Sequence, residues 1–273
     1  MPFPQRVLDL AENRGLGEPV RAYDGGPAYR RAVTWLVLLG TAGVLLVLSS
    51  ILYLVDGWYW LGGTGVVLAI GYLAGTGWIL RAGGLRGRGR AFHLFEHGFV
   101  HTAGKSAEVC PWNALLSVTV SGVRRSAAHR RTDWRFTVAR ADGHRVSFGR
   151  ELPGAREFGE IVTGEVTRRT VPRLLAAVEG GERVTVGPFA VDRDGVEKEG
   201  ERVPWSEVGE VGIDNGMVFV RRADGAPGPS ALAGGMPNAV AFAELCCGAR
   251  DAARRPHSAF GSGGVSGSNS LDV

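Results

Sequence analysis

The feature that most constrains this chain is a stretch of residues 32–80 that contains a single charged side chain, Asp56. Charged residues are distributed through the rest of the chain at the density usual for water-soluble proteins. Residues 32–55 and 60–80 are both free of charge and long enough to cross a bilayer as helices. Because backbone polar groups in lipid need partners within the chain, we expect helices in both segments. The sequence therefore predicts a transmembrane helical hairpin over residues 32–80.

The connection between the two segments, residues 56–59, is too short to leave the membrane interface. Aromatic residues gather around it, namely Tyr53, Trp58, Tyr59 and Trp60. Amphipathic rings are typical of the headgroup level of a bilayer. The two helices are thus expected to be joined by a tight turn.

Positive charge lies on the open side of the hairpin and is missing from its turn. Six residues are predicted to lie at the membrane interface, where they would set topology and contact headgroups: Arg30, Arg31, Arg81, Arg86, Arg88 and Arg90. Because Lys and Arg are retained on the cytoplasmic side, residues 1–31 are expected to be a cytoplasmic N-terminal segment. We therefore predict a multi-pass protein of the plasma membrane with both termini in the cytoplasm. Neither span contains an ionisable residue, which argues against a transporter, a channel or a proton relay.

An internal repeat follows the hairpin. Each copy contains a Pro-Trp pair, then apolar residues three, six and eight positions after the Trp, then an Asp-Gly pair typical of a hairpin turn. The four residues that we interpret as structural anchors of the repeat are Pro111, Trp112, Pro204 and Trp205. An amphipathic helix pattern closes each copy.

These patterns predict an α+β fold for the part that follows the helical hairpin. We expect two tandem units, residues 91–180 and 182–255, each a small antiparallel barrel or sandwich closed by a C-terminal helix. The Gly/Ser-rich tail, residues 256–273, is expected to be disordered because its composition cannot form a packed core.

Several short motifs resemble those of a known family. They are the two Pro-Trp pairs, Gly15-Leu16-Gly17, Gly187-Pro188-Phe189 and Met236-Pro237-Asn238. Together with the order of elements, they resemble the bacterial pleckstrin-homology-like (PH-like) fold. Over residues 5–255 the chain resembles an uncharacterised family of bacterial membrane proteins with a helical hairpin and tandem PH-like repeats. The resemblance implies a fold, and the family brings no established activity with it.

The first copy is longer than the second by a basic segment, which we predict to be a loop. Its arginines are Arg124, Arg125, Arg130 and Arg131. Basic residues beside an anionic membrane each contribute about 1 kcal/mol, so this loop is a candidate for lipid contact. The alternative is a solvated loop in an arginine-rich protein, and the sequence leaves both open.

No catalytic motif is recognisable, and we predict no catalytic residues and no cofactor. His93, His97 and His101 recur every four residues, as metal ligands on a helix do. Their surroundings resemble a strand, on which they would be too far apart for one metal ion, so we predict a solvated strand face and no metal site. The three cysteines lack paired spacing and are expected to be free thiols.

The sequence thus favours a non-enzymatic scaffold that presents two PH-like modules at the cytoplasmic membrane face for protein binding. A sensor of anionic lipid or of a small ligand, acting through the basic first module, is the alternative. The expected partners are membrane lipids and an unidentified protein, and no nucleic acid is expected. Gly71 and Gly75 form a G-x-x-x-G motif, which serves either homo-oligomerisation or packing within the hairpin.

Overall fold

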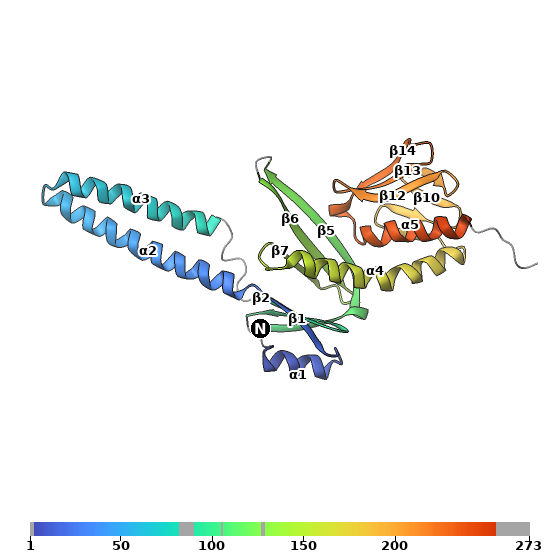
Figure 1. The fold of residues 1–273 in the computed structure, drawn as a ribbon, viewed down its shortest axis with the longest axis horizontal. Helices are drawn as coiled ribbons and strands as arrows, with labels where there is room; N and C mark the ends of the chain where they lie inside the picture. Colours follow the sequence, from blue (N-terminus) through green and yellow to red (C-terminus); the bar gives the residue numbers. More distant parts are fainter. Residues whose placement is uncertain (1–2, 82–89, 105, 127–128, 255–273) are drawn as a thin grey trace, which may run out of the picture.

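The computed structural model describes residues 3–81, 90–104, 106–126 and 129–254. It begins with helix α1 (Gln5–Asn13) and strand β1 (Pro19–Asp24). Two long helices follow, α2 (Gly26–Val55) and α3 (Tyr59–Arg81). Figure 1 shows that these two helices form a hairpin that projects away from the sheets.

The hairpin agrees with the apolar stretch of the sequence, although α2 begins six residues before the predicted start at residue 32. Both helices are long and apolar enough to cross a membrane, judged by length and composition. Only 11% of each apolar window is buried. A core helix of a water-soluble protein would be mostly buried, so these two helices lack the packing of such a core.

Small residues allow α2 and α3 to approach each other closely. Gly65 lies directly against Ser50, and a Cβ atom on Gly62 would lie 2.6 Å from Cγ of Leu54. The Ser50 hydroxyl is buried between the helices and donates to the Leu46 carbonyl at 2.6 Å. Glycine and serine therefore allow the closest contacts between the two helices of the hairpin.

The first α+β unit contains two antiparallel sheets and one helix. The strand order is β1-β2-β3-β4 in one sheet and β5-β6-β7 in the other. Its remaining elements are β2 (Arg90–Phe95), β3 (Gly98–Ala103), β4 (Ser106–Pro111), the 3-10 helix η1 (Trp112–Ala114), β5 (Leu115–Ser126), β6 (His129–Arg140), β7 (Arg145–Gly149) and α4 (Ala155–Glu179).

The second unit has the same order of sheets and helix. Its strand orders are β11-β10-β9-β8 and β12-β13-β14. The elements are β8 (Val184–Val186), β9 (Phe189–Val191), β10 (Gly195–Lys198), β11 (Glu201–Pro204), β12 (Val208–Asp214), β13 (Met217–Arg222), β14 (Pro227–Leu232), the 3-10 helix η2 (Ala233–Gly235) and α5 (Ala239–Arg254).

The helical hairpin is inserted into the first unit. Strand β1 lies before the hairpin in the chain and β2 after it, yet the two strands pair, with Ala22 opposite His93. Residues 19–24, which the sequence assigns to the N-terminal segment, are thus part of the first sheet. The equivalent strands of the second unit, β8 and β9, are joined by Gly187 and Pro188 alone.

Both faces of the first sheet are covered. One face contributes Phe92 and Phe99 to a core that also contains Phe158 of α4. The other face packs against α1 through Phe95 and Val100. The middle strands of this sheet are therefore buried on both sides, and β2 has five consecutive buried residues.

Helix α4 is shared by the two units. Its N-terminal half contributes Phe158, Val162 and Val166 to the first core. Its C-terminal half contributes Val178 to the second core, with Leu174 and Leu175 packed against it. Figure 1 shows α5 lying along this second half. One helix therefore closes the first unit and supports the second.

The predicted α+β class is correct, but closed barrels are not formed. Within the described residues each unit contains two separate open sheets, and no strand of one sheet pairs with a strand of the other. The chain changes sheet after β4, where Pro111 ends the strand and η1 begins. Proline cannot donate a ladder hydrogen bond, so pairing stops there.

Candidate functional site

The predicted interface arginines that the structure describes lie at the open end of the hairpin. Arg30 and Arg31 are exposed in the first turns of α2, and Arg81 is the exposed last residue of α3. Arg90 is exposed at the start of β2. Arg86 and Arg88 fall outside the described residues. All four described residues therefore lie in the segments that connect the hairpin to the first unit, namely the start of α2, the end of α3 and the start of β2.

The basic segment of the first unit is not a long loop. Arg124 and Arg125 lie in β5, and Arg130 and Arg131 lie in β6. Figure 1 shows these two strands as an extended hairpin that reaches beyond the rest of the sheet. The predicted loop is therefore wrong; the arginines and serine there show no alternation of apolar residues that would indicate strand ends.

The two Pro-Trp pairs occupy matching positions. Trp112 lies in the first core and Trp205 in the second, and each side chain is 3% exposed. The Trp112 indole N–H donates to the Glu96 carbonyl at 2.9 Å, and that of Trp205 donates to the Asp192 carbonyl at 3.1 Å. Each indole thus ties the start of the second sheet to a hairpin turn of the first sheet in its own unit.

The Asp-Gly turns are also built alike. The Asp142 carboxylate accepts the His144 N–H at 3.0 Å, and Asp224 accepts the Ala226 N–H at 2.9 Å. Two residues before each aspartate is an arginine that pairs with a glutamate of the first sheet. The pairs are Arg140–Glu108 and Arg222–Glu201. Both glutamates stand four residues before the tryptophan of their unit.

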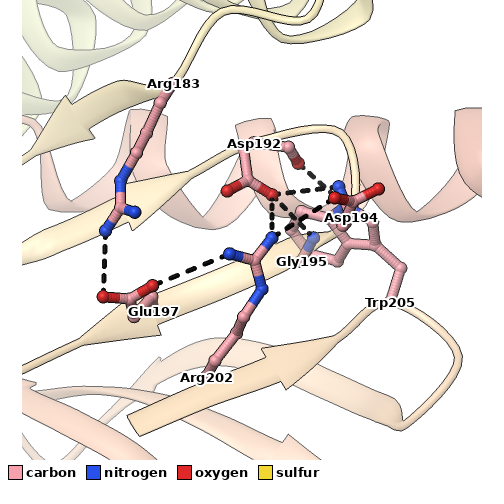
Figure 2. Close-up of polar contacts among 7 residues, drawn as sticks. All are labelled: Arg183, Asp192, Asp194, Gly195, Glu197, Arg202 and Trp205. Atoms are coloured by element: carbon pink, nitrogen blue, oxygen red, sulfur yellow. Dashed lines mark hydrogen bonds and ion pairs between the residues drawn. The ribbon is translucent and has the colours of Figure 1, made fainter. Parts of the chain in front are cut away.

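A group of charged residues surrounds the turn between β9 and β10 (Figure 2). Asp192 accepts main-chain N–H groups from Asp194 at 3.0 Å and Gly195 at 3.1 Å, and a guanidinium N–H from Arg202 at 2.7 Å. Glu197 pairs with Arg202 and also with Arg183, the latter at 2.9 Å. Because Asp192 and Glu197 are both paired with arginine, we interpret the group as a support for the turn. Partly exposed ion pairs of this kind contribute little stability.

This charged group is not recognisable in the sequence. The run Asp192-Arg193-Asp194-Gly195 has turn composition, which indicates the turn. The arginines that complete the group come from β11 and from the residue before β8, so only the pairing of strands brings them there.

The three histidines do not share a solvated strand face, so that prediction is wrong. His93 is in β2 and is 5% exposed, His97 is exposed in the β2–β3 turn, and His101 is half-buried in β3. His93 faces the α1 side, with its ring 5.5 Å from Phe3, whereas His101 stacks on Phe92 in the first core. Burial occurs because α1 covers a face that the sequence alone presents as open. In the described part of the chain no group of three potential ligands could hold a metal ion.

Acid should destabilise the first unit through His93. Burial lowers the pKa of His93, although Asp24 opposes this effect, and its Nδ1 has no hydrogen-bond partner among the described residues. A folded-state pKa below the unfolded value of about 6.5 means that the unfolded state binds more protons. The associated stability is thus present above pH 6.5 and is lost as the pH falls through the folded-state pKa. Urea denaturation between pH 7.5 and about pH 5 would measure the slope of the free energy of unfolding against pH.

His93→Leu should flatten that slope, because leucine fits the apolar contact with Phe3 and does not titrate. His97→Leu is the matched control, since His97 is exposed in the turn next to β2. Equal slopes for the wild type and His93→Leu would contradict the assignment of the pH dependence to His93. Burial also lowers the pKa of His101, so a smaller slope is expected to remain in His93→Leu.

The cysteines offer no reactive thiol in the cores. Cys110 and Cys246 are fully buried, and none of the three cysteines forms a disulfide. Burial raises the pKa of Cys110 to about 12, although Arg140 opposes the shift. Because the thiolate is the nucleophile, Cys110 lies in the wrong environment for covalent chemistry.

One asparagine of the second unit forms hydrogen bonds with the first unit. Asn238 precedes α5, has a positive φ of 57°, and contacts the edge strand β5 of the first unit. Its main-chain N–H donates to the Val118 carbonyl at 2.8 Å, and its side-chain oxygen accepts the Val118 N–H at 2.9 Å. Its side-chain amide donates to the Leu116 carbonyl at 3.1 Å. Asn238 therefore occupies the edge of β5 as a neighbouring strand would.

Asn238→Gly should lower the free energy of unfolding by about 1–2 kcal/mol, because it removes two hydrogen bonds and leaves the Val118 N–H without its acceptor. Glycine keeps the left-handed backbone, so the change isolates the side chain. Asn215→Gly is the matched control, since Asn215 also has a positive φ and, among the described residues, its side chain bonds only to its neighbour Asp214. Urea denaturation measures the free energy of unfolding of both variants. Equal losses of stability would contradict a role for Asn238 at β5.

The G-x-x-x-G glycines are not the closest points of the hairpin. A Cβ atom on Gly71 would meet nothing within 4 Å, and one on Gly75 would lie 3.8 Å from Leu39. The close contacts fall at Gly62 and Gly65 instead. Self-association through Gly71 and Gly75 stays a prediction.

Comparison with known protein families gives one match. A model of a family of unknown function, DUF6585, matches residues 3–230, which include the hairpin, the first unit and most of the second. Neither the curated proteins nor the solved structures give a significant match. The family match extends over far more than half of the chain, and it agrees with the resemblance to an uncharacterised family. The chain therefore belongs to the DUF6585 family of unknown function.

Proposed function

We propose that this protein is a non-enzymatic membrane scaffold, of bacterial origin, that holds a protein partner at the cytoplasmic face of the plasma membrane. The hairpin α2–α3 is the anchor, and the two α+β units are PH-like modules that provide the binding surface. The observation that carries the proposal is the position of the anchor. It is inserted between two paired strands of the first unit.

This insertion supports a fixed position of the first unit at the membrane. Only Gly25 separates β1 from α2, and its N–H donates to the Arg90 carbonyl at 3.2 Å. The exposed arginines at the open end of the hairpin agree with a cytoplasmic location of the sheets, because positive charge is retained on that side. A terminal anchor on a flexible linker would leave the units free to move away.

The contacts that recur in the two units support the assignment of a duplicated PH-like module. The indole-to-turn hydrogen bond, the Arg–Glu pair before the Asp-Gly turn and the aspartate cap of that turn occur at matching positions in the two units. Each unit also has a four-stranded sheet, then a three-stranded sheet, then a helix.

Cysteine labelling in intact bacterial cells tests the anchor and its orientation. Asp56→Cys places a thiol in the hairpin turn, and Ala141→Cys places one in an exposed turn of the first unit. In a Cys247→Ser background, which keeps the fully buried Cys110 and Cys246, an impermeant maleimide should label position 56 in intact cells. Position 141 should react only after permeabilisation. The reverse pattern, or extraction of the protein by alkaline carbonate, would overturn the proposal.

Contact with anionic lipid by the β5–β6 hairpin is the second candidate function. It is supported by the extension of these strands, whose ends contain four arginines (Figure 1). Liposomes with anionic lipid should then protect the amides of residues 124–126 from hydrogen exchange in the full chain. Changing Arg124, Arg125, Arg130 and Arg131 to serine should abolish that protection, and unchanged protection would refute lipid binding by this hairpin.

A further inference from the structure

Two edge strands of the described sheets have neither a proline nor a short length to discourage strand pairing. Edges β1, β4, β11 and β14 contain proline, and the edges β7 and β8 are five and three residues long. Proline and short length both discourage the addition of another strand. The two remaining edges, β5 and β12, are longer and contain no proline.

The edge of β5 shows how the outward backbone groups of such a strand find hydrogen-bond partners in this fold. Asn238 forms three hydrogen bonds with Leu116 and Val118, through its backbone and its side chain. Counted from the tryptophan of each unit, the equivalent residues on β12 are Gly209 and Val211. The second unit thus has an edge equivalent to the one that Asn238 covers in the first.

The free edge of β12 begins at Val211. A two-residue turn, Asn215-Gly216, joins β12 to β13 after the pair Asp214–Met217. In such a hairpin, hydrogen-bonded pairs alternate with non-bonded pairs, so Val211 and Ile213 direct their N–H and C=O groups away from β13. Arg250 and Arg254 reach only the start of the strand, at the carbonyls of Gly209 (2.7 Å) and Val208 (3.4 Å). No described residue hydrogen-bonds to the outward groups of Val211 and Ile213.

The side chains of β12 define the partner's chemistry. Val211 packs against the second core, and Ile213, on the same face, is 41% exposed. Glu210 and Asp214 are exposed on the opposite face, where Arg221 pairs with Glu210 at 2.5 Å. An added strand therefore meets an apolar surface on one face and excess negative charge on the other.

This charge argues against pairing of β12 with a second copy of itself. An antiparallel β12–β12 pair centred on Val211 would place Glu210 and Asp214 of both copies on one face. Like charges on neighbouring strands are destabilising, whereas a basic side chain between them would be favourable.

We propose that the β12 edge, from Gly209 to Asp214, binds an extended segment of a partner protein that alternates apolar and basic residues. Its backbone pairs with Val211 and Ile213, its apolar side chains lie beside Ile213, and its basic side chains face Glu210 and Asp214. Addition of a strand to a sheet edge is a general mode of peptide recognition. This inference rests on the proposed function as a partner-binding scaffold and names the binding strand and the class of partner segment.

The test uses the full chain in lipid nanodiscs and two acetylated, amidated peptides, Val-Lys-Val-Lys-Val and its acidic twin Val-Glu-Val-Glu-Val. The basic peptide should slow hydrogen exchange at the amides of Val211 and Ile213, and the acidic twin should not. Asp214→Lys should weaken binding of the basic peptide about tenfold and favour the acidic twin. Ile213→Pro removes one outward N–H and should also abolish protection at Val211, whereas the control Ile213→Val should retain it.

Absence of protection by the basic peptide, or equal protection by both peptides, would overturn the inference. Protection of Val211 in the absence of peptide, together with a dimer in solution, would replace it with self-pairing. If the chain is incorporated in nanodiscs and β12 stays unprotected, the membrane anchor survives and only the β12 site fails. If β12 binds the basic peptide in detergent but the hairpin does not insert, only the anchor fails.

Discussion

Replacing Trp205 with alanine is expected to lower the free energy of unfolding of the second unit by about 3–5 kcal/mol. The Trp205 side chain lies in the second core, and its indole N–H donates to the Asp192 carbonyl. Truncation leaves a cavity and removes the donor that this carbonyl uses, so two losses add. Urea denaturation of the full chain in detergent micelles measures the change. Hydrogen exchange at β10 and β12 assigns it to the second unit.

Two other tryptophan variants separate the contributions. Trp205→Phe keeps a buried ring but loses the indole N–H, and we expect a loss of about 1–2 kcal/mol. Trp134→Ala is a control of the same size at a site that is 38% exposed, where the loss should be less than 1 kcal/mol. If Trp205→Ala costs no more than Trp134→Ala, Trp205 is not an anchor of the second unit.

Local features of the fold were predictable from the sequence. The two apolar helices follow from the length of the uncharged segments, and both Asp-Gly pairs lie in turns between neighbouring strands. Trp112 and Trp205 lie at matching places, between the last strand of the first sheet and the first strand of the second sheet of their unit. In each case the signal lies in consecutive residues, and the backbone preference that it reflects is local.

Pairing between distant segments was not predictable in the same way. Strand β1 pairs with β2 although Ala22 and His93 are separated by the whole hairpin, and no periodicity records such a partner. Burial of His93 depends on α1, which covers a face that would otherwise be open. The open sheets in place of barrels likewise depend on which strands pair, and a one-residue change of register would reverse the faces.

The candidate sites differ from their sequence predictions for the same reason, namely that they depend on contacts between distant segments. The arginines of the β5–β6 hairpin were recognised as basic but assigned to a loop, since strand length is set by the partner strand. In the sequence, Asn238 stands out only as part of the motif Met236-Pro237-Asn238. Its contact with β5 arises from the packing of the second unit on the first, which brings together residues more than one hundred positions apart. The β12 edge likewise depends on strand pairing, because its outward groups follow from the register of β12 with β13.

The second substitution with a large expected effect on stability is at Gly195. This glycine begins β10 opposite Pro204, and a Cβ atom there would lie 2.9 Å from Cα of Pro204 and also press on the Val203 carbonyl. Both contacts are with backbone, which cannot rotate away. Gly195→Ala should therefore lower the free energy of unfolding of the second unit by about 2–3 kcal/mol, the upper part of the range for overpacking.

The matched control is Gly164→Ala, the same substitution on the exposed surface of α4, where a Cβ atom would meet nothing within 4 Å. Alanine favours a helix over glycine, so this variant should be stabilised by about 0.5–1 kcal/mol. Urea denaturation of both variants in detergent micelles gives the comparison, and the two changes should have opposite signs. Because Gly98 meets Pro111 in the same way, with a Cβ 2.7 Å from its Cα, Gly98→Ala should reproduce the loss in the first unit. A neutral result at both glycines would mean that the strands β3 and β10 can shift away from the prolines, and that the close contact before each tryptophan does not fix the pairing of β3 with β4 and of β10 with β11.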